Sequence, residues 1–127
     1  MSDVFISYSS VDREIAKRLA EALKARGFDV WWDAALYAGQ NFPLAIRQAI
    51  NDAKAVVAVW STTSAVSNWV LGEASEAGSK LICVRLDGLP MTVVPIPYLP
   101  LHCELVSNED AIANAVRHKL DGTGDHF

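Results

Sequence analysis

The stretch AKAVVAVW at residues 53–60 constrains the fold of this chain more than any other feature. It contains the longest apolar run of the sequence, Ala55 to Trp60, and lacks the alternation of apolar and polar residues that is typical of a half-exposed strand. A strand that is apolar on both sides is typical of the centre of a parallel sheet, where helices cover both faces. The run is also far too short to cross a bilayer. The stretch therefore predicts a buried, parallel α/β sheet.

Strands and helices are expected to alternate along the rest of the sequence. Apolar and β-branched segments predict strands at residues 3–8, 28–32, 53–60, 80–86 and 102–106. Apolar residues at helical spacing predict a helix that ends at Gly27, one that follows Pro43, one that ends near Gly78, and one over residues 111–120. This alternation predicts an α/β, three-layer flavodoxin-like fold, with a five-stranded parallel sheet in the order 2-1-3-4-5 and helices on both faces.

Length and composition fit a single domain. The chain has 127 residues, of which 51% are hydrophobic, and this is enough to build a core. We expect the domain to occupy residues 1–120 and residues 121–127 to form a C-terminal tail or the start of a linker. Because the numbering begins at Met1, we expect either an N-terminal fragment or a short standalone protein.

Charge and cysteine usage argue against several classes of protein. The net charge is −4 and no Lys/Arg cluster is present, so a nucleic-acid partner is not expected. The N-terminus lacks the basic and apolar regions of a signal peptide, which predicts a cytoplasmic protein without a membrane partner. Cys83 and Cys103 are expected to be free thiols in the core, rather than a disulfide or a metal pair. The histidines share no ligand spacing with carboxylates, so no metal site is predicted.

A binding site is expected where the order of the strands reverses, beyond the carboxyl ends of the first and third strands. Ser9 and Ser10 follow the first strand, and Ser61 follows the third. The loop after Ser61 leads to Trp69 and Glu73, which lie four residues apart and therefore share one face of a helix. An aromatic ring beside one carboxylate can hold a heterocycle and act on a sugar. The topology thus predicts that this pair lies beside the cleft.

Several common ligand-binding motifs are missing from the sequence. Phosphoryl-group receivers of similar fold need an acidic pair after the first strand and an aspartate that ends the third, and this chain has serines in both places. A P-loop, a GxGxxG dinucleotide fingerprint at a strand–helix turn and a GxSxG elbow are also missing. These absences argue against a receiver, a nucleotide triphosphatase and a serine hydrolase.

Three further side chains have simple structural interpretations. Asp12 is expected to cap the first helix or to act as a charge in its first turn. Trp31 and Trp32 are neighbours on the second strand, so their side chains are expected to face opposite ways and to pack in the core.

Three blocks of the sequence resemble the Toll/interleukin-1 receptor (TIR) domain family. Residues 5–12 (FISYSSVD) look like its opening box, in a form seen in bacterial members. Residues 27–33 (GFDVWWD) and 39–43 (GQNFP) are similar to its second strand and to the BB loop that follows. Residues 64–73 (SAVSNWVLGE) are similar to the family signature Ser-x-x-Ser-x-Trp-x-x-x-Glu. The blocks occur in order and at suitable spacing, so the resemblance covers nearly the whole chain.

The resemblance implies an enzyme that acts on NAD⁺ as its substrate and needs no cofactor. Many bacterial and plant members, and one class of animal axon-degeneration proteins, cleave the nicotinamide–ribose bond. These members carry a glutamate four residues after a tryptophan, and Glu73 and Trp69 match the two positions. Glu73 is thus the expected catalytic residue, and Trp69 is expected to pack against the nicotinamide or its ribose. The products would be nicotinamide and either ADP-ribose or a cyclic isomer of it.

The resemblance also implies further pocket residues and partners. Ser9 and Ser10 are expected to line the pocket, although some cleaving relatives have arginines there. Asp33 is expected to hold the loop or a ribose, and Phe42 matches a BB-loop aromatic that faces the nucleotide in some members. Activity in this family commonly requires self-association, often with a fused sensor domain. The implied setting is bacterial immunity, including antiviral defence, or virulence.

A single carboxylate is chemically sufficient for this reaction. Most glycosidases need a second acid to protonate the leaving group. Nicotinamide in NAD⁺ is already a cationic pyridinium and leaves as a neutral molecule, so no general acid is needed. One glutamate can stabilise the oxocarbenium-like ribose and accept a hydrogen bond from its hydroxyls.

Two alternative functions remain open at this stage. A non-catalytic TIR adaptor would act only through TIR–TIR contacts, and it would depend on the surface of residues 34–42 rather than on Glu73. A nucleoside-transferring enzyme of related fold would also use a glutamate on ribose, but its substrate would be a free nucleoside.

Overall fold

The computed structural model describes residues 3–32, 48–66, 68–94 and 103–121. These residues form a single five-stranded sheet in the order β2-β1-β3-β4-β5, and every neighbouring pair of strands is parallel. The strands are β1 (Val4–Ser7), β2 (Val30–Trp31), β3 (Ala55–Trp60), β4 (Leu81–Arg85) and β5 (Cys103–Leu105). The predicted flavodoxin-like strand order is therefore confirmed.

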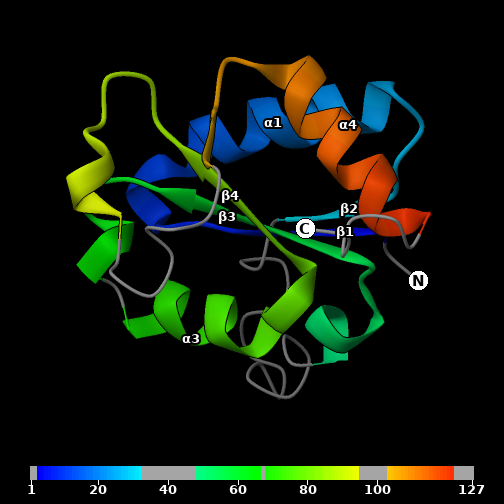
Figure 1. Cartoon of the computed structure of the whole chain (residues 1–127), viewed down its shortest axis with the longest axis horizontal. Helices are drawn as coiled ribbons and strands as arrows, with labels where there is room; N and C mark the ends of the chain where they lie inside the picture. The colour runs from blue at the N-terminus through cyan, green and yellow to red at the C-terminus, as the bar shows by residue number, and fades with distance from the viewer. Residues whose placement is uncertain (1–2, 33–47, 67, 95–102, 122–127) are drawn as a thin grey trace.

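Helices cover both faces of this sheet, as the sequence predicts. Figure 1 shows α1 and α4 together on one face and α3 on the opposite face. Residues 48–52 are helical, and they are the described part of the helix predicted after Pro43. The other helices are α1 (Arg13–Ala25), α3 (Asn68–Ala77) and α4 (Glu109–Leu120), with short 3₁₀ turns η1 (Ser10–Asp12), η3 (Ser64–Val66), η4 (Gly78–Lys80) and η5 (Met91–Val93).

Strand β3 lies at the centre of the sheet, and all six of its residues are buried. Val57 and Val59 belong to the cluster that α1 and α4 cover, whereas Ala58 and Trp60 belong to the cluster beneath α3. Successive side chains of a strand point to opposite faces, so a strand covered on both faces must be apolar at every position. The continuous apolar run of β3 is the consequence.

The two tryptophans of the second strand region pack on opposite faces of the sheet, as predicted. Trp31 stacks on Phe5, with ring centroids 4.9 Å apart. Trp32 packs against the cluster on the α1 side, where its ring lies 6.2 Å from that of Tyr8 and the Arg13 guanidinium lies 5.3 Å from the ring centroid. Aromatic packing on both sides thus fixes the orientation of this part of the sheet edge.

Gly27 ends α1 and turns the chain into the second strand. Its φ of 92° lies in the left-handed region, which glycine adopts without steric cost. The Gly27 N–H donates to the Lys24 carbonyl at 3.0 Å, and the Phe28 N–H donates to the Leu23 carbonyl at 3.2 Å. These two bonds form a Schellman motif, which satisfies the last carbonyls of the helix and directs Phe28 into the core.

Asn108 caps the start of α4, and we predict that Asn108→Ala destabilises the domain. The Asn108 Oδ1 accepts a hydrogen bond from the Ala111 N–H at 3.3 Å. Removing such a cap typically costs about 1 kcal/mol of unfolding free energy. Thermal and chemical denaturation should show this loss, whereas Asn108→Asp, which keeps the acceptor, should unfold close to the wild type. An Asn108→Ala chain as stable as the wild type would contradict the capping role.

Candidate functional site

The carboxyl ends of β1 and β3 lie side by side, where the strand order predicts a binding site. Ser7 of β1 is in register with Ala58 of β3, so the segments that follow both strands leave the same edge of the sheet. The Asp12 N–H donates to the Ser9 carbonyl at 2.8 Å and closes the η1 turn after β1. Ser9 and Ser61, both predicted site residues, are buried here.

A buried hydrogen-bond network joins these two segments. The Ser61 hydroxyl donates to the Asp12 Oδ2 at 2.6 Å, across 49 positions of sequence. The Ser61 N–H donates to the Ser64 Oγ at 2.7 Å, and the Ser64 N–H donates to the Ser61 Oγ at 3.1 Å. The Ser64 hydroxyl in turn donates to the Val59 carbonyl at 2.8 Å. The network therefore connects η1, the end of β3 and η3.

Asp12 has a different role from the one that the sequence suggests. It occupies the residue before α1, as expected of a cap, but its side chain makes no capping hydrogen bond. The Asp12 side chain accepts the Ser61 hydroxyl proton instead, and only 7% of the residue is exposed. Burial of a carboxylate is costly unless hydrogen bonds compensate, so the nearby serine hydroxyl determines where this side chain points.

Ser61 makes its hydrogen bonds within the protein. Its hydroxyl proton is donated to Asp12, and its oxygen accepts the Ser64 N–H. We therefore assign Ser61 to the framework of the site, and direct contact with a ligand stays a prediction.

Helix α3 starts directly after this network. The Ser61–Ser64 turn leads through η3 into Asn68, the first residue of α3. The α3 backbone places residues 69 and 73 one helical turn apart, close behind the carboxyl end of β3. Buried Val70 and Ala74 anchor α3 on the sheet.

Five predicted site residues lie wholly or partly outside the described residues. Asp33 and Phe42 lie outside the described residues, as do the side chains of Ser10, Trp69 and Glu73. Their proposed roles therefore rest on sequence position, and for the last two also on the backbone of α3.

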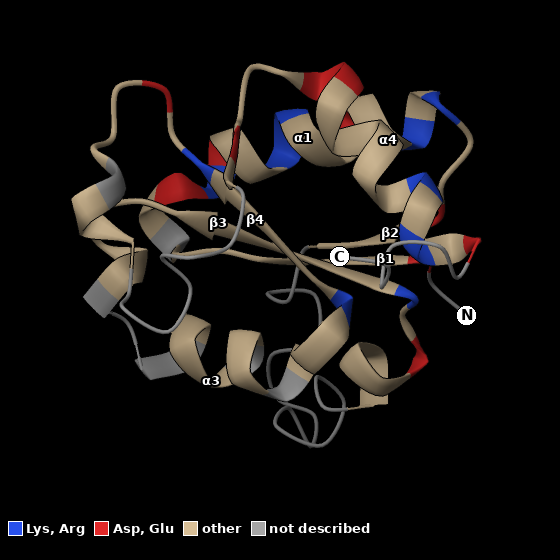
Figure 2. Ribbon diagram, in the orientation of Figure 1, with Lys and Arg blue, Asp and Glu red and all other residues tan. Residues whose placement is uncertain are grey.

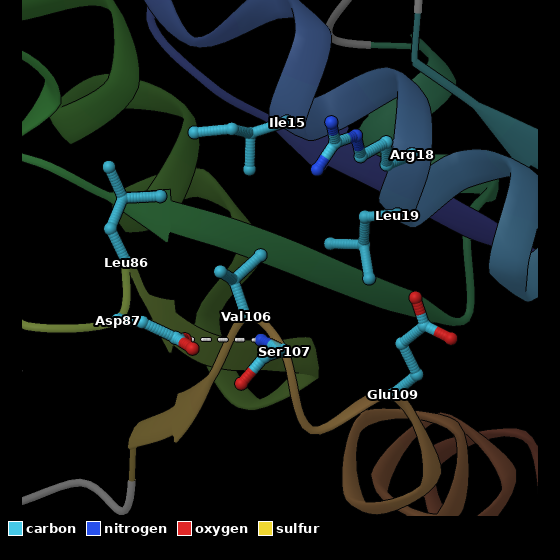
Figure 3. A pocket seen from close by; sticks show the side chains of 8 residues that line it. All are labelled: Ile15, Arg18, Leu19, Leu86, Asp87, Val106, Ser107 and Glu109. Atoms are coloured by element: carbon cyan, nitrogen blue, oxygen red, sulfur yellow. Dashed lines mark hydrogen bonds between the residues drawn. The ribbon is translucent and has the colours of Figure 1, made fainter.

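A pocket of about 490 Å³ lies at a different position, beyond the carboxyl ends of β4 and β5. Figure 3 shows apolar side chains at its base and the charged side chains of Arg18, Asp87 and Glu109 around it. The Ser107 N–H donates to the Asp87 Oδ1 at 3.2 Å and closes one side. Neither Ser9 nor Ser61, the two predicted site residues whose side chains the structure describes, contributes to this pocket. The described residues that line it are Ile15, Arg18, Leu19, Leu86, Asp87, Val106, Ser107 and Glu109.

Charged residues of both signs are interspersed on the face formed by α1 and α4 (Figure 2). In the ranges given above, no three His, Cys, Asp or Glu side chains are grouped so that they could hold a metal ion. Likewise, no helix within the described residues is long and apolar enough to span a bilayer.

Sequence reasoning missed the structural importance of Asp12 and Ser64. The sequence contains a pattern that could have indicated both residues. Asp12 closely follows the first strand, and Ser61 and Ser64 form a Ser-x-x-Ser pattern after the third. In the predicted strand order, these two segments lie side by side. Ser and Asp side chains in such loops often hydrogen-bond to nearby backbone groups, as Ser64 does here.

The chain forms a parallel α/β domain in which a buried polar network joins the segments after β1 and β3. A scan against family models matches the TIR domain over residues 4–118. The chain therefore belongs to the TIR domain family. A search of curated protein sequences gives no significant match.

Solved structures with a similar fold include receptors and isolated TIR domains. Two structures of a metazoan TIR-STING receptor from C. gigas, one of them in complex with 2′,3′-cGAMP, align with TM-scores of 0.79 and 0.78 at 25% and 27% identity. They cover 91% of this chain, which spans only 39% and 40% of the receptor chains.

Two more distant structures show similarity in the fold alone. The TIR domain of the Toll-related receptor TRR-2 from Hydra magnipapillata aligns with a TM-score of 0.71 at 20% identity, covering 96% of this chain and 97% of that one. The TIR domains of the activated Roq1 resistosome align with a TM-score of 0.61 at 18% identity, covering 100% and 86% of the two chains.

Proposed function

We propose that this TIR domain is an NAD⁺ nucleosidase that cleaves the nicotinamide–ribose bond. The observation that carries the proposal is the position of residues 69 and 73. They lie one turn apart in the first six residues of α3, the helix that follows the loop after the carboxyl end of central strand β3. Trp69 and Glu73 are the residue types that the reaction needs at these positions. The products are nicotinamide and ADP-ribose or a cyclic ADP-ribose isomer.

In this mechanism Glu73 acts on the ribose. As the bond to the pyridinium breaks, positive charge develops on the ribose ring, and a nearby carboxylate stabilises it. The nicotinamide leaves as a neutral molecule, so no group has to protonate it. Trp69 packs against the nicotinamide or its ribose, and Ser9, Ser10 and Phe42 contribute to the walls of the pocket.

The buried network supports this mechanism by positioning α3. An electrostatic catalyst is effective only when its charge is held in place before the reaction begins. Asp12 and Ser61 connect the loop after β1 to the loop that leads into α3. We assign both as positioning residues, together with Ser64.

Self-association and a fused sensor complete the proposal. The TIR-STING chains are more than twice as long as this one, and their TIR part is joined to a further region. We propose a TIR domain at residues 1–120 that works in the cytoplasm as part of a longer protein or assembly. Contact between copies switches on NAD⁺ cleavage in immune signalling.

The choice of substrate tests the class of reaction. We expect nicotinamide release from NAD⁺ and much slower release from nicotinamide riboside, measured by chromatography at matched concentrations. Preference for the free nucleoside would point to a nucleoside-transferring enzyme. Turnover of neither substrate, in a dispersed and in an artificially clustered form, would favour an adaptor.

A further inference from the structure

Cys83 and Cys103 are direct neighbours on adjacent strands. They are in register in the parallel pair β4–β5, and both side chains belong to the buried cluster beneath α3. Both are free thiols, as the sequence predicts. The chain has two cysteines in total, and the fold therefore brings its entire thiol content together.

The two neighbouring thiols shift each other's pKa in opposite directions. The neighbouring Cys103 thiol holds the pKa of Cys83 below its usual value, against the opposing effect of burial and with further help from the Trp60 side chain. The Cys83 side chain raises the pKa of Cys103, and burial raises it further. A thiol paired with a neighbouring thiolate is the arrangement from which a disulfide forms.

Strand β5 gives this pair access and freedom to move. It is three residues long and, among the described strands, lies at the edge of the sheet and pairs with β4 alone. Cys103 is 9% exposed and Cys83 is 2% exposed, so an oxidant must approach from the edge strand. Local opening of a short edge strand requires less free energy than global unfolding. Small oxidants can therefore reach the pair in a chain that stays folded.

We propose that Cys83 and Cys103 form a redox-sensitive dithiol, which a peroxide converts reversibly into a cross-strand disulfide that repositions α3. The Cys83 thiolate attacks one peroxide oxygen, the O–O bond breaks, and Cys83 becomes a sulfenic acid while hydroxide leaves. The Cys103 sulfur then attacks the Cys83 sulfur, the S–O bond breaks, and the Cys103 proton converts the departing hydroxide into water. The proton that Cys83 releases when it ionises neutralises the first hydroxide, so in total two thiols and hydrogen peroxide give one disulfide and two waters.

Formation of this bond requires a shift in the sheet edge. Neighbouring strands lie about 4.8 Å apart, whereas the Cβ atoms of a disulfide lie about 3.8 Å apart. Strand β5 must therefore move toward β4, and the disulfide is expected to be easily reduced. Val70 and Ala74 of α3 pack in the same cluster as the two cysteines, so the movement reaches the helix that carries residues 69 and 73. The effect of this movement on NAD⁺ cleavage rests on the proposed function, whereas disulfide formation and the movement of α3 do not.

The test uses hydrogen peroxide on the folded wild-type chain, followed by alkylation and intact-mass analysis. We expect loss of both free thiols and of two hydrogen atoms, a Cys83–Cys103 linkage in the peptide map, and full reversal by dithiothreitol. Cys103→Ala, which removes one of the two thiols, should lose the intramolecular linkage. Thiols that pair only in denaturant, or that give sulfinic acid or linked dimers instead, would overturn the proposal.

Hydrogen exchange provides a readout that does not depend on catalysis. Amides of α3 (Asn68–Ala77) should exchange several-fold differently in the oxidised and reduced chains, while α1 on the opposite face should change little. If the α3 amides exchange at the same rate in both forms, the proposed movement of α3 on oxidation is wrong. A chain that forms the disulfide and shifts α3, yet never cleaves NAD⁺, would refute the proposed function and leave this inference intact.

Discussion

Glu73→Gln is expected to lower the rate of nicotinamide release from NAD⁺ by about 10²–10³-fold, because a preorganised electrostatic group typically contributes that much to a rate. Glutamine keeps the size and part of the hydrogen bonding of glutamate but removes the negative charge that stabilises the developing ribose cation. The Michaelis constant should change much less than kcat, since the charge acts mainly in the transition state. Steady-state kinetics with chromatographic detection measures both constants.

Glu76→Gln is the matched control for this substitution. Glu76 lies on the same helix, three residues further along, so its replacement removes the same charge without touching the predicted catalytic position. We expect near wild-type turnover from this variant and a melting temperature close to that of Glu73→Gln. Equal turnover by wild type and Glu73→Gln would place the catalytic centre elsewhere.

Asp12→Ala is expected to lower both stability and activity, although Asp12 is not predicted to touch the substrate. The variant leaves the Ser61 hydroxyl without its acceptor at a buried position, and loss of a hydrogen bond to a charged group costs about 2 kcal/mol. The junction between η1 and the loop that leads to α3 loosens as a result. Urea denaturation should show the loss of unfolding free energy, and turnover should fall in a chain that is still folded at low temperature.

Asp12→Asn separates the hydrogen bond from the charge. The asparagine side-chain carbonyl can still accept the Ser61 proton, so this variant should retain more stability than Asp12→Ala and recover part of the activity. Ser61→Ala should behave like Asp12→Ala, because it breaks the same contact from the other side. Wild-type stability in both alanine variants would show that the network does not hold the two loops together.

Much of the fold follows from residue patterns that admit few alternatives. The apolar run of β3 is typical of a strand covered on both faces, and the alternation of strands with helices predicts the parallel strand order. Gly27 marks the end of α1 because its positive φ is easily adopted by glycine. Trp31 and Trp32 could be assigned to opposite faces because strand side chains alternate.

The site was harder to predict because polar side chains have several possible partners. A residue such as Asp12, placed just before a helix, can cap the helix or bond to another loop, and local sequence does not decide between them. In the folded chain the buried Ser61 hydroxyl, 49 positions away in the sequence, donates to the Asp12 side chain, which therefore does not cap the helix. The thiol pair depends in the same way on register, since only the alignment of β4 with β5 brings Cys83 beside Cys103.

Nicotinamide release from NAD⁺, measured chromatographically for the wild-type domain in dispersed and artificially clustered forms, decides whether this domain cleaves NAD⁺. We predict release that rises on clustering, together with an equal amount of ADP-ribose or of a cyclic isomer. Absence of nicotinamide in both forms, from a chain shown to be folded, would contradict the assignment as an NAD⁺-cleaving enzyme.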